Sequence, residues 1–129
     1  MRVHHVGYLV KNLDKARAKF EVLGYTAEGP VTYDDYRGID IQFLINGETR
    51  VELIRQVKED SIVANLYDRY KNSPYHICYI ADHFEEDIEY LRKNGFVEID
   101  EPHEAPALND KKVTFFMNAS IGIIELLEE

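Results

Sequence analysis

The sequence predicts an α+β fold in which tandem βαβββ modules form a curved mixed sheet. The first observation is an internal repeat, since the segment that begins at His5 aligns without a gap with the segment that begins at His76. The second is that VELI, from Val51, matches IELL, from Ile124, after small slips in the loops. The third is the hydrophobic periodicity, which in each half alternates, becomes helical and then alternates again. Each half is therefore expected to be the same supersecondary unit.

The first half begins with an alternating strand at 4–10 and continues with a helix at 11–24. Apolar residues recur in this helix at helical spacing, Asn12 is placed to cap its amino end, and Gly24 is placed to end it. Strands rich in β-branched and aromatic residues come next. They are expected at 25–33, 38–46 and 49–55.

The second half repeats this order, with a helix expected at 82–95. Asp82 followed by Glu85 resembles a capping box, and Gly95 ends the helical pattern. The remaining strands are expected at 96–102, 111–118 and 121–129.

The length of 129 residues predicts a single domain, 1–129, with module 1 at about 1–56 and module 2 at about 73–129. A short linker helix at about 59–72 should turn Ile62, Val63, Leu66 and Tyr70 inward. A module with one helix cannot cover both faces of its sheet, so the two modules should pack around a shared concave surface. We expect a homodimer, in which the modules pair within one chain or are swapped between chains.

Charge and composition exclude several function classes. The net charge of −9 disfavours binding to nucleic acid or to an anionic membrane surface. No apolar run reaches the roughly 20 residues of a membrane span, and the first residues lack a signal-peptide pattern, so a cytoplasmic protein is expected. Cys78, the only cysteine, lies in an apolar run and is expected to be a small buried side chain.

Two glutamates occur inside strands that otherwise have an apolar pattern. In VELI, alternation puts Val51 and Leu53 on one face and Glu52 on the other. Glu125 has the same position within IELL. A carboxylate buried at such a site needs a cation, a metal or a proton, because leaving it unpaired costs several kcal/mol.

Two histidines complete a repeated pattern of possible metal ligands. His5 and His76 begin the two modules, as Glu52 and Glu125 end them, so four ligands form two related pairs. Imidazole and carboxylate suit divalent ions such as zinc, cobalt, nickel, manganese or iron. The sequence therefore predicts a metal-binding cleft between the modules. Taken singly, each histidine fits a satisfied core residue, and each glutamate fits an ion pair.

The repeat, the histidine near each first strand and the terminal Glu-Leu resemble the vicinal oxygen chelate superfamily, which includes glyoxalases, methylmalonyl-CoA epimerases and bleomycin resistance proteins. The resemblance covers the whole chain. It implies that His5, Glu52, His76 and Glu125 hold a divalent metal, Ni²⁺, Co²⁺ or Zn²⁺. The order Glu-Leu-Ile, Asp60-Ser61, short helix and His76-Ile is similar to the epimerase branch.

This resemblance also implies a reaction class. The chain would be a metal-dependent isomerase or lyase that transfers a proton through a metal-bound enediolate or enolate. Glu125 would be the general base, with Glu52 the related candidate for the opposite face of the substrate. A methylmalonyl-CoA epimerase-like enzyme is the leading interpretation. The alternatives are a lactoylglutathione lyase (glyoxalase I), with a hemithioacetal rather than a thioester substrate, and a metal-free antibiotic-binding protein of the bleomycin resistance type.

Overall fold

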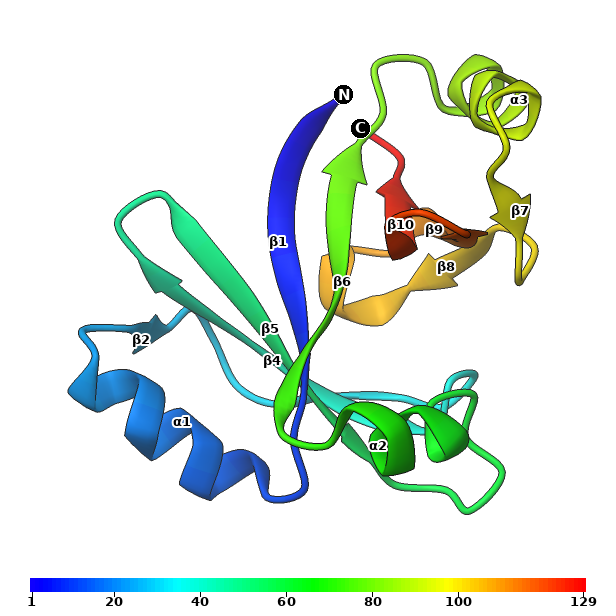
Figure 1. Ribbon diagram of the computed structural model, residues 1–129. Coiled ribbons are helices and arrows are strands. Elements are labelled where there is room, and N and C mark those ends of the chain that lie inside the picture. The colour runs from blue at the N-terminus through cyan, green and yellow to red at the C-terminus, as the bar shows by residue number, and fades with distance from the viewer. The chain divides into compact units, whose positions relative to one another are not determined.

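The computed structural model describes all residues, Met1–Glu129, and contains ten strands, three α-helices and one 3-10 helix (Figure 1). The strands are β1 (Arg2–Leu9), β2 (Thr26–Ala27), β3 (Thr32–Asp34), β4 (Ile39–Asn46), β5 (Thr49–Gln56), β6 (Ser73–Ile80), β7 (Val97–Glu98), β8 (His103–Ala105), β9 (Lys111–Asn118) and β10 (Gly122–Leu127). The helices are α1 (Leu13–Val22), α2 (Ala64–Tyr70), α3 (Phe84–Lys93) and the 3-10 helix η1 (Pro106–Leu108). The strands pair in both parallel and antiparallel fashion, which confirms the predicted α+β class.

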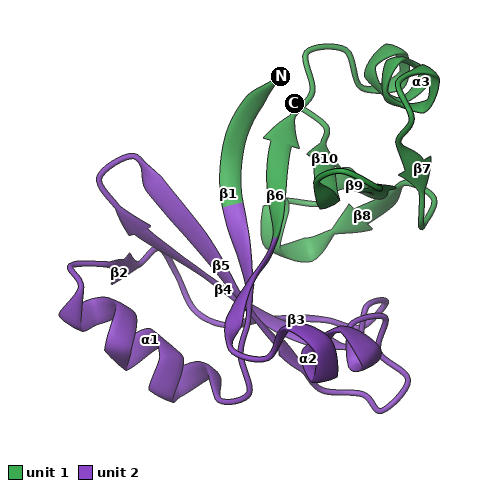
Figure 2. Cartoon of the chain, in the orientation of Figure 1, with its two compact units in different colours: residues 1–5, 76–129 green, residues 6–75 purple.

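The chain divides into two compact units (Figure 2). Unit 1 contains Met1–His5 and His76–Glu129, and unit 2 contains Val6–Tyr75. Strand β1 is divided between them, since its first residues belong to unit 1 and the rest to unit 2. The single domain and the module boundaries at 1–56, 59–72 and 73–129 stay predictions.

In unit 2 the strand order is β2-β4-β5-β1, with β3 paired to β4. Strands β4 and β5 are antiparallel, whereas β1 and β5 are parallel from Val6 opposite Val51 onward. Helix α1 packs on β4 and β5. Asn12 caps α1 as predicted, because its side-chain Oδ1 accepts a hydrogen bond of 2.9 Å from the backbone N–H of Lys15. Gly24 follows the helix with a φ of +100°, so it supplies the left-handed residue that ends it.

In unit 1 the order is β6-β10-β9-β7, with β8 paired to β9. Strands β6 and β10 are parallel, and β9 and β10 are antiparallel. Helix α3 packs against β7 and β10, and it buries Ile88 and Leu91 as its apolar spacing predicts. The same parallel and antiparallel arrangement therefore occurs in both units.

The helix-to-sheet cores of the two units are built from repeat-equivalent residues. The pairs are Tyr8 with Tyr79, Phe20 with Leu91, Leu44 with Phe116, Val51 with Ile124, and Leu53 with Leu126. Val51 and Leu53 thus lie on the helix-covered face of their sheet, and Ile124 and Leu126 do the same. Because strand side chains alternate, the glutamate between each pair lies on the opposite face, as predicted.

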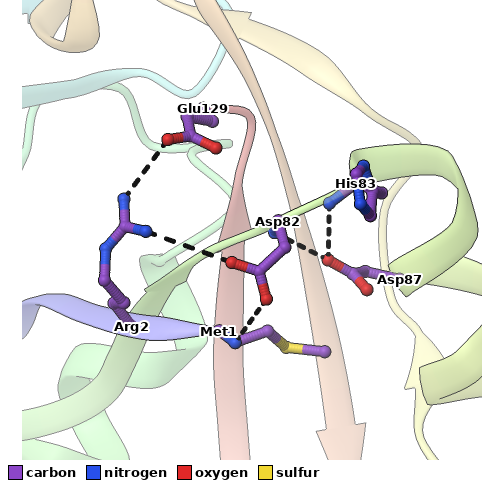
Figure 3. A network of polar contacts seen from close by, with 6 residues as sticks. All are labelled: Met1, Arg2, Asp82, His83, Asp87 and Glu129. Carbon is purple, nitrogen blue, oxygen red and sulfur yellow. Dashed lines mark hydrogen bonds and ion pairs between the residues drawn. The ribbon is translucent and has the colours of Figure 1, made fainter.

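The predicted capping box of α3 is wrong. The helix begins after His83, whose side chain makes no capping hydrogen bond. Asp87, in the first turn, instead accepts hydrogen bonds from the backbone N–H groups of Asp82 and His83 at 2.9 and 3.1 Å (Figure 3). The capping acceptor therefore comes from inside the helix and reaches back.

Asp82 has a different role, which is to form ion pairs with two positively charged groups at the amino end of β1. Its carboxylate lies 2.9 Å from the Met1 amino group and 4.0 Å from the Arg2 guanidinium (Figure 3). The hydrogen bond from the Met1 amino group, together with the positive charge of that group, lowers the pKa of Asp82. Arg2 also contacts Glu129 at 3.4 Å, so this network joins β1 to residues that follow β6 and β10.

The linker helix is shorter than predicted, since α2 begins only at Ala64. Val63 precedes it and is buried as expected, whereas Ile62, predicted to face inward, is 50% exposed. The prediction for Ile62 was wrong because this residue lies before the first helical turn, where helical spacing does not decide its direction. None of the three helices has the length and apolar character needed to cross a bilayer.

The turn between β3 and β4 is held by buried polar contacts in unit 2. Asp34 accepts hydrogen bonds from the backbone N–H and the guanidinium of Arg37, at 3.0 and 2.8 Å, and both residues are buried. The Ser61 hydroxyl donates a 2.7 Å hydrogen bond to the Arg37 carbonyl. Gly38, with a φ of +66°, accepts hydrogen bonds from the N–H groups of Val57 and Lys58. This turn is thereby fastened to the chain that leads into α2.

Gly38→Ala should destabilise the protein by about 1–3 kcal/mol, because alanine is strained at positive φ and lacks space here. A Cβ at Gly38 would lie 2.9 Å from Cβ of Lys58. Urea unfolding of the variant measures the loss. Gly29→Ala is the matched control, since nothing lies within 4 Å of a Cβ there. Equal stability of the two variants would contradict the proposed strain.

Lys58→Met should raise the pKa of Asp35 toward its ordinary value of 3.8, since the hydrogen bond from Lys58 is the main cause of its lowered pKa. A carboxylate with a depressed folded-state pKa stabilises the fold above its unfolded pKa and loses that contribution as the pH falls through the folded value. The stability difference between wild type and variant should therefore shrink between pH 6 and pH 3. An NMR titration of the Asp35 carboxyl carbon checks the shift, with Lys93→Met as the charge-matched control.

Candidate metal centre

The face of unit 1 that lies away from α3 carries a set of buried polar side chains. Alternation along β6 places His76 and Cys78 on this face, because Tyr79 and Ala81 pack in the helix-covered core. On β10 the same argument places Glu125 beside Leu127. The sequence creates this site by putting single polar residues into apolar strands at positions turned away from the helix.

The register of β6 and β10 brings His76 close to Glu125. These parallel strands pair Ile123 with His76, and Glu125 with Cys78. Nε2 of His76 lies 3.7 Å from Oε2 of Glu125. The imidazole packs edge-on against Phe115, with ring centroids 5.3 Å apart and an interplanar angle of 90°. Packing on an aromatic ring limits the rotation of His76 and directs Nε2 at the carboxylate.

His5, from β1, joins this pair. Its Nε2 lies 3.3 Å from Nε2 of His76 and 3.7 Å from Oε1 of Glu125. The Glu125 carboxylate therefore turns one oxygen toward each imidazole. His5, His76 and Glu125 are 1%, 3% and 3% exposed, so all three groups meet out of contact with bulk water. These predicted site residues are thus brought together within unit 1.

The donor set fits a divalent metal ion. Two imidazole nitrogens and a carboxylate are the ligands of many zinc, nickel and cobalt sites. Ligand atoms held about 2.1 Å from an ion lie roughly 3.0–3.5 Å from one another in common geometries. The observed separations of 3.3, 3.7 and 3.7 Å are close to that range. A cation would also offset the cost of burying a carboxylate among apolar strands.

Glu52, the fourth predicted ligand, lies on β5 in unit 2 and is 3% exposed. Its cross-strand partners are Gly7 on β1 and Phe43 on β4. Glu125 has Cys78 and Phe115 in the corresponding places. The repeat therefore extends to the register, because each glutamate occupies the same position within its own unit.

Arg50, two residues before Glu52 on β5, binds Glu28. Its Nε and Nη2 donate hydrogen bonds of 2.6 and 3.2 Å to the two oxygens of that carboxylate. The hydrogen bond to Glu28 raises the pKa of Arg50. Glu28 already balances the charge of this guanidinium.

Sequence reasoning missed a contact made by His4. His4 and His5 are consecutive on β1, so their side chains leave the strand on opposite faces, yet the Nδ1 atoms of the two rings lie only 2.8 Å apart. Cys78, fully buried as predicted, also lies close, since its Sγ is within 4.8 Å of a ring nitrogen of each histidine. The His-His doublet was the available signal, but the face rule describes Cβ directions and does not limit the reach of a ring.

A model of the "Glyoxalase/Bleomycin resistance protein/Dioxygenase superfamily" matches residues 4–115. The bovine (Bos taurus) mitochondrial methylmalonyl-CoA epimerase is 32% identical over 83 residues, which cover 63% of this chain and 47% of that protein. This match spans about half the length of the bovine relative. The human (Homo sapiens) mitochondrial methylmalonyl-CoA epimerase is 28% identical over 129 residues, covering 97% of this chain and 72% of the human protein.

Solved structures share the fold. A Streptomyces coelicolor methylmalonyl-CoA epimerase variant, solved in complex with 2-nitronate-propionyl-CoA, has a TM-score of 0.85 and 20% sequence identity. The match covers 100% of this chain and 94% of that one. At this identity the likeness concerns the fold alone.

Proposed function

Because the chain belongs to the glyoxalase/bleomycin resistance protein/dioxygenase superfamily, we propose that it is a metal-dependent isomerase of the methylmalonyl-CoA epimerase type. The single observation that carries the proposal is the convergence of His5, His76 and Glu125 in a buried cluster. A metal ion would supply the positive charge that offsets the cost of burying this carboxylate, which a metal-free binding protein would have to balance with a proton.

In this proposal His5, His76 and Glu125 hold a divalent ion, and Glu52 is the fourth ligand. The assignment of Glu52 rests on its equivalence to Glu125 in the repeat and in the strand register. Imidazole and carboxylate ligands suit a divalent ion, and Ni²⁺, Co²⁺ and Zn²⁺ are the ions that the family resemblance implies. When bound, such an ion supplies Lewis-acid chemistry that polarises a substrate carbonyl and acidifies the adjacent C–H.

The protein's own part in the reaction is proton transfer. We assign the general base to Glu125, whose carboxylate is buried and close to both imidazoles. Glu52 is the related group for the opposite face of the same carbon. An epimerase needs two such groups, because the proton is removed from one face and returned to the other. Burial of the glutamates keeps bulk water from competing for the proton.

The proposed substrate is a 2-methyl-branched acyl-CoA thioester. Both mammalian relatives are named as methylmalonyl-CoA epimerases, and the similar Streptomyces structure holds a CoA thioester analogue. A lactoylglutathione lyase, with a hemithioacetal substrate, is the second candidate, because the same four ligands would serve proton transfer between neighbouring carbons. Assembly as a homodimer and a cytoplasmic location stay predictions from the sequence.

Metal binding tests the site directly. Chelator-treated protein should take up about one Ni²⁺, Co²⁺ or Zn²⁺ ion per chain, and His76→Ala or Glu52→Ala should abolish this, because each removes a proposed ligand. Isothermal titration calorimetry measures the affinity and the number of ions bound per chain. His103→Ala, which changes a histidine of β8 outside the cluster, is the matched control. Undiminished binding in both ligand variants would exclude the proposed site.

A paired assay distinguishes the two reactions. With cobalt or nickel bound, the protein should exchange deuterium at C2 of methylmalonyl-CoA. Formation of a thioester from methylglyoxal and glutathione would instead identify the lyase. Glu125→Gln should lower the exchange rate by about 10²–10⁴-fold, as expected for loss of a general base. Activity in neither assay contradicts both substrate assignments.

A further inference from the structure

His4 contacts the His5 ring on the side opposite the proposed metal. Its Nδ1 lies 2.8 Å from Nδ1 of His5, and the rings meet edge-to-face with centroids 5.1 Å apart at 80°. Nε2 of His5 points the other way, toward His76 and Glu125. The two nitrogens of the His5 ring are therefore used differently, one toward His4 and one toward the proposed metal.

Metal binding by His5 would decide which of the two rings donates the hydrogen bond in this contact. An imidazole that binds a metal through Nε2 carries its single proton on Nδ1, so Nδ1 must donate a hydrogen bond. At 2.8 Å the atom that receives it is Nδ1 of His4. His4 must then carry its own proton on Nε2. The opposite arrangement would place the His5 proton on Nε2, where it would block the metal.

We propose that His4 is a positioning residue that fixes the tautomer and ring orientation of His5 for metal binding. The inference rests on the metal site proposed above. Metal-ligating histidines generally donate their second N–H to an acceptor, and loss of that acceptor weakens metal affinity about 10–100-fold. Here a neutral imidazole, rather than a carboxylate or a carbonyl, accepts this bond.

The contact between neighbouring histidines occurs in only the first half of the repeat. The position equivalent to His4 is Tyr75, whose ring lies 6.3 Å from that of Tyr70, measured between centroids. His76 is instead held by the edge-on contact with Phe115. The two histidine ligands thus have different neighbours, and a change at position 4 should act first on His5.

Cys78 offers a competing explanation of the same geometry. His4, His5 and Cys78 each present a ligand atom within 4.8 Å of the others, so these three groups could themselves bind a thiophilic ion. Such an ion would bind Nδ1 of His5, and the proton of that ring would then lie on Nε2. Variants of Cys78 separate the two explanations, because the 2.8 Å contact joins the two ring nitrogens directly.

The experiment compares zinc affinity by competition with a chromophoric chelator in five proteins: wild type, His4→Asn, His4→Phe, His4→Ala and Cys78→Ala. His4→Phe and His4→Ala should bind zinc about 10–100-fold more weakly, because neither offers an acceptor. His4→Asn, whose Oδ1 can take the place of Nδ1, should stay within a few-fold of wild type. Cys78→Ala should bind as wild type does. Thermal unfolding of the metal-free proteins reports whether each variant is folded.

A spectroscopic readout accompanies the affinities. Long-range ¹H–¹⁵N NMR of the zinc-loaded wild type should show His5 protonated on Nδ1, with a hydrogen-bonded proton signal that disappears in His4→Ala. Wild-type affinity in both His4→Phe and His4→Ala overturns the proposal, and so does equal loss in Cys78→Ala. Absence of zinc binding in wild type, or binding that survives His76→Ala, contradicts the metal site itself and is thereby distinguished from failure of the His4 assignment alone.

Discussion

The burial of a carboxylate between two imidazoles is the constraint on which the site depends. Glu125 turns one oxygen toward His5 and the other toward His76, with each N···O separation at 3.7 Å. None of these groups can be buried alone without a large desolvation cost. Together they form a set whose charge a proton or a cation can balance. The apolar strands around them hold the set in place and raise the strength of its electrostatic interactions.

Duplication explains how a small chain builds such a set. Each unit uses one helix to cover one face of its sheet, and equivalent residues pack under α1 and α3. The other face carries the site's polar residues, in unit 1 beside a second apolar cluster that includes Val113 and Leu127. The glutamate of β5 has the same register as that of β10. One supersecondary plan therefore provides a histidine at the start and a glutamate at the end of each half. The two halves differ at positions next to these ligands. Gly7 in the first half is equivalent to Cys78 in the second, and His4 is equivalent to Tyr75.

Much of this was predictable from the sequence because it depends on local periodicity. Alternation placed Glu52 and Glu125 opposite the apolar pairs, and Asn12 and Gly24 marked the ends of α1. The failures involve choices between chemically similar partners. Asp87 rather than Asp82 supplies the cap of α3, because a carboxylate in the first turn can reach back to the same N–H groups. The His4 contact depends on ring rotation, which no spacing rule describes.

The division of β1 between the two units has a consequence for folding order. Unit 2 is one continuous segment, Val6–Tyr75, whereas unit 1 joins Met1–His5 to His76–Glu129. Closing the loop between His5 and Glu125 requires contacts between residues near the two ends of the chain, and such non-local contacts form slowly. We therefore expect the metal centre to form late in folding. An ion that binds there would then stabilise a chain that has already brought its ends together.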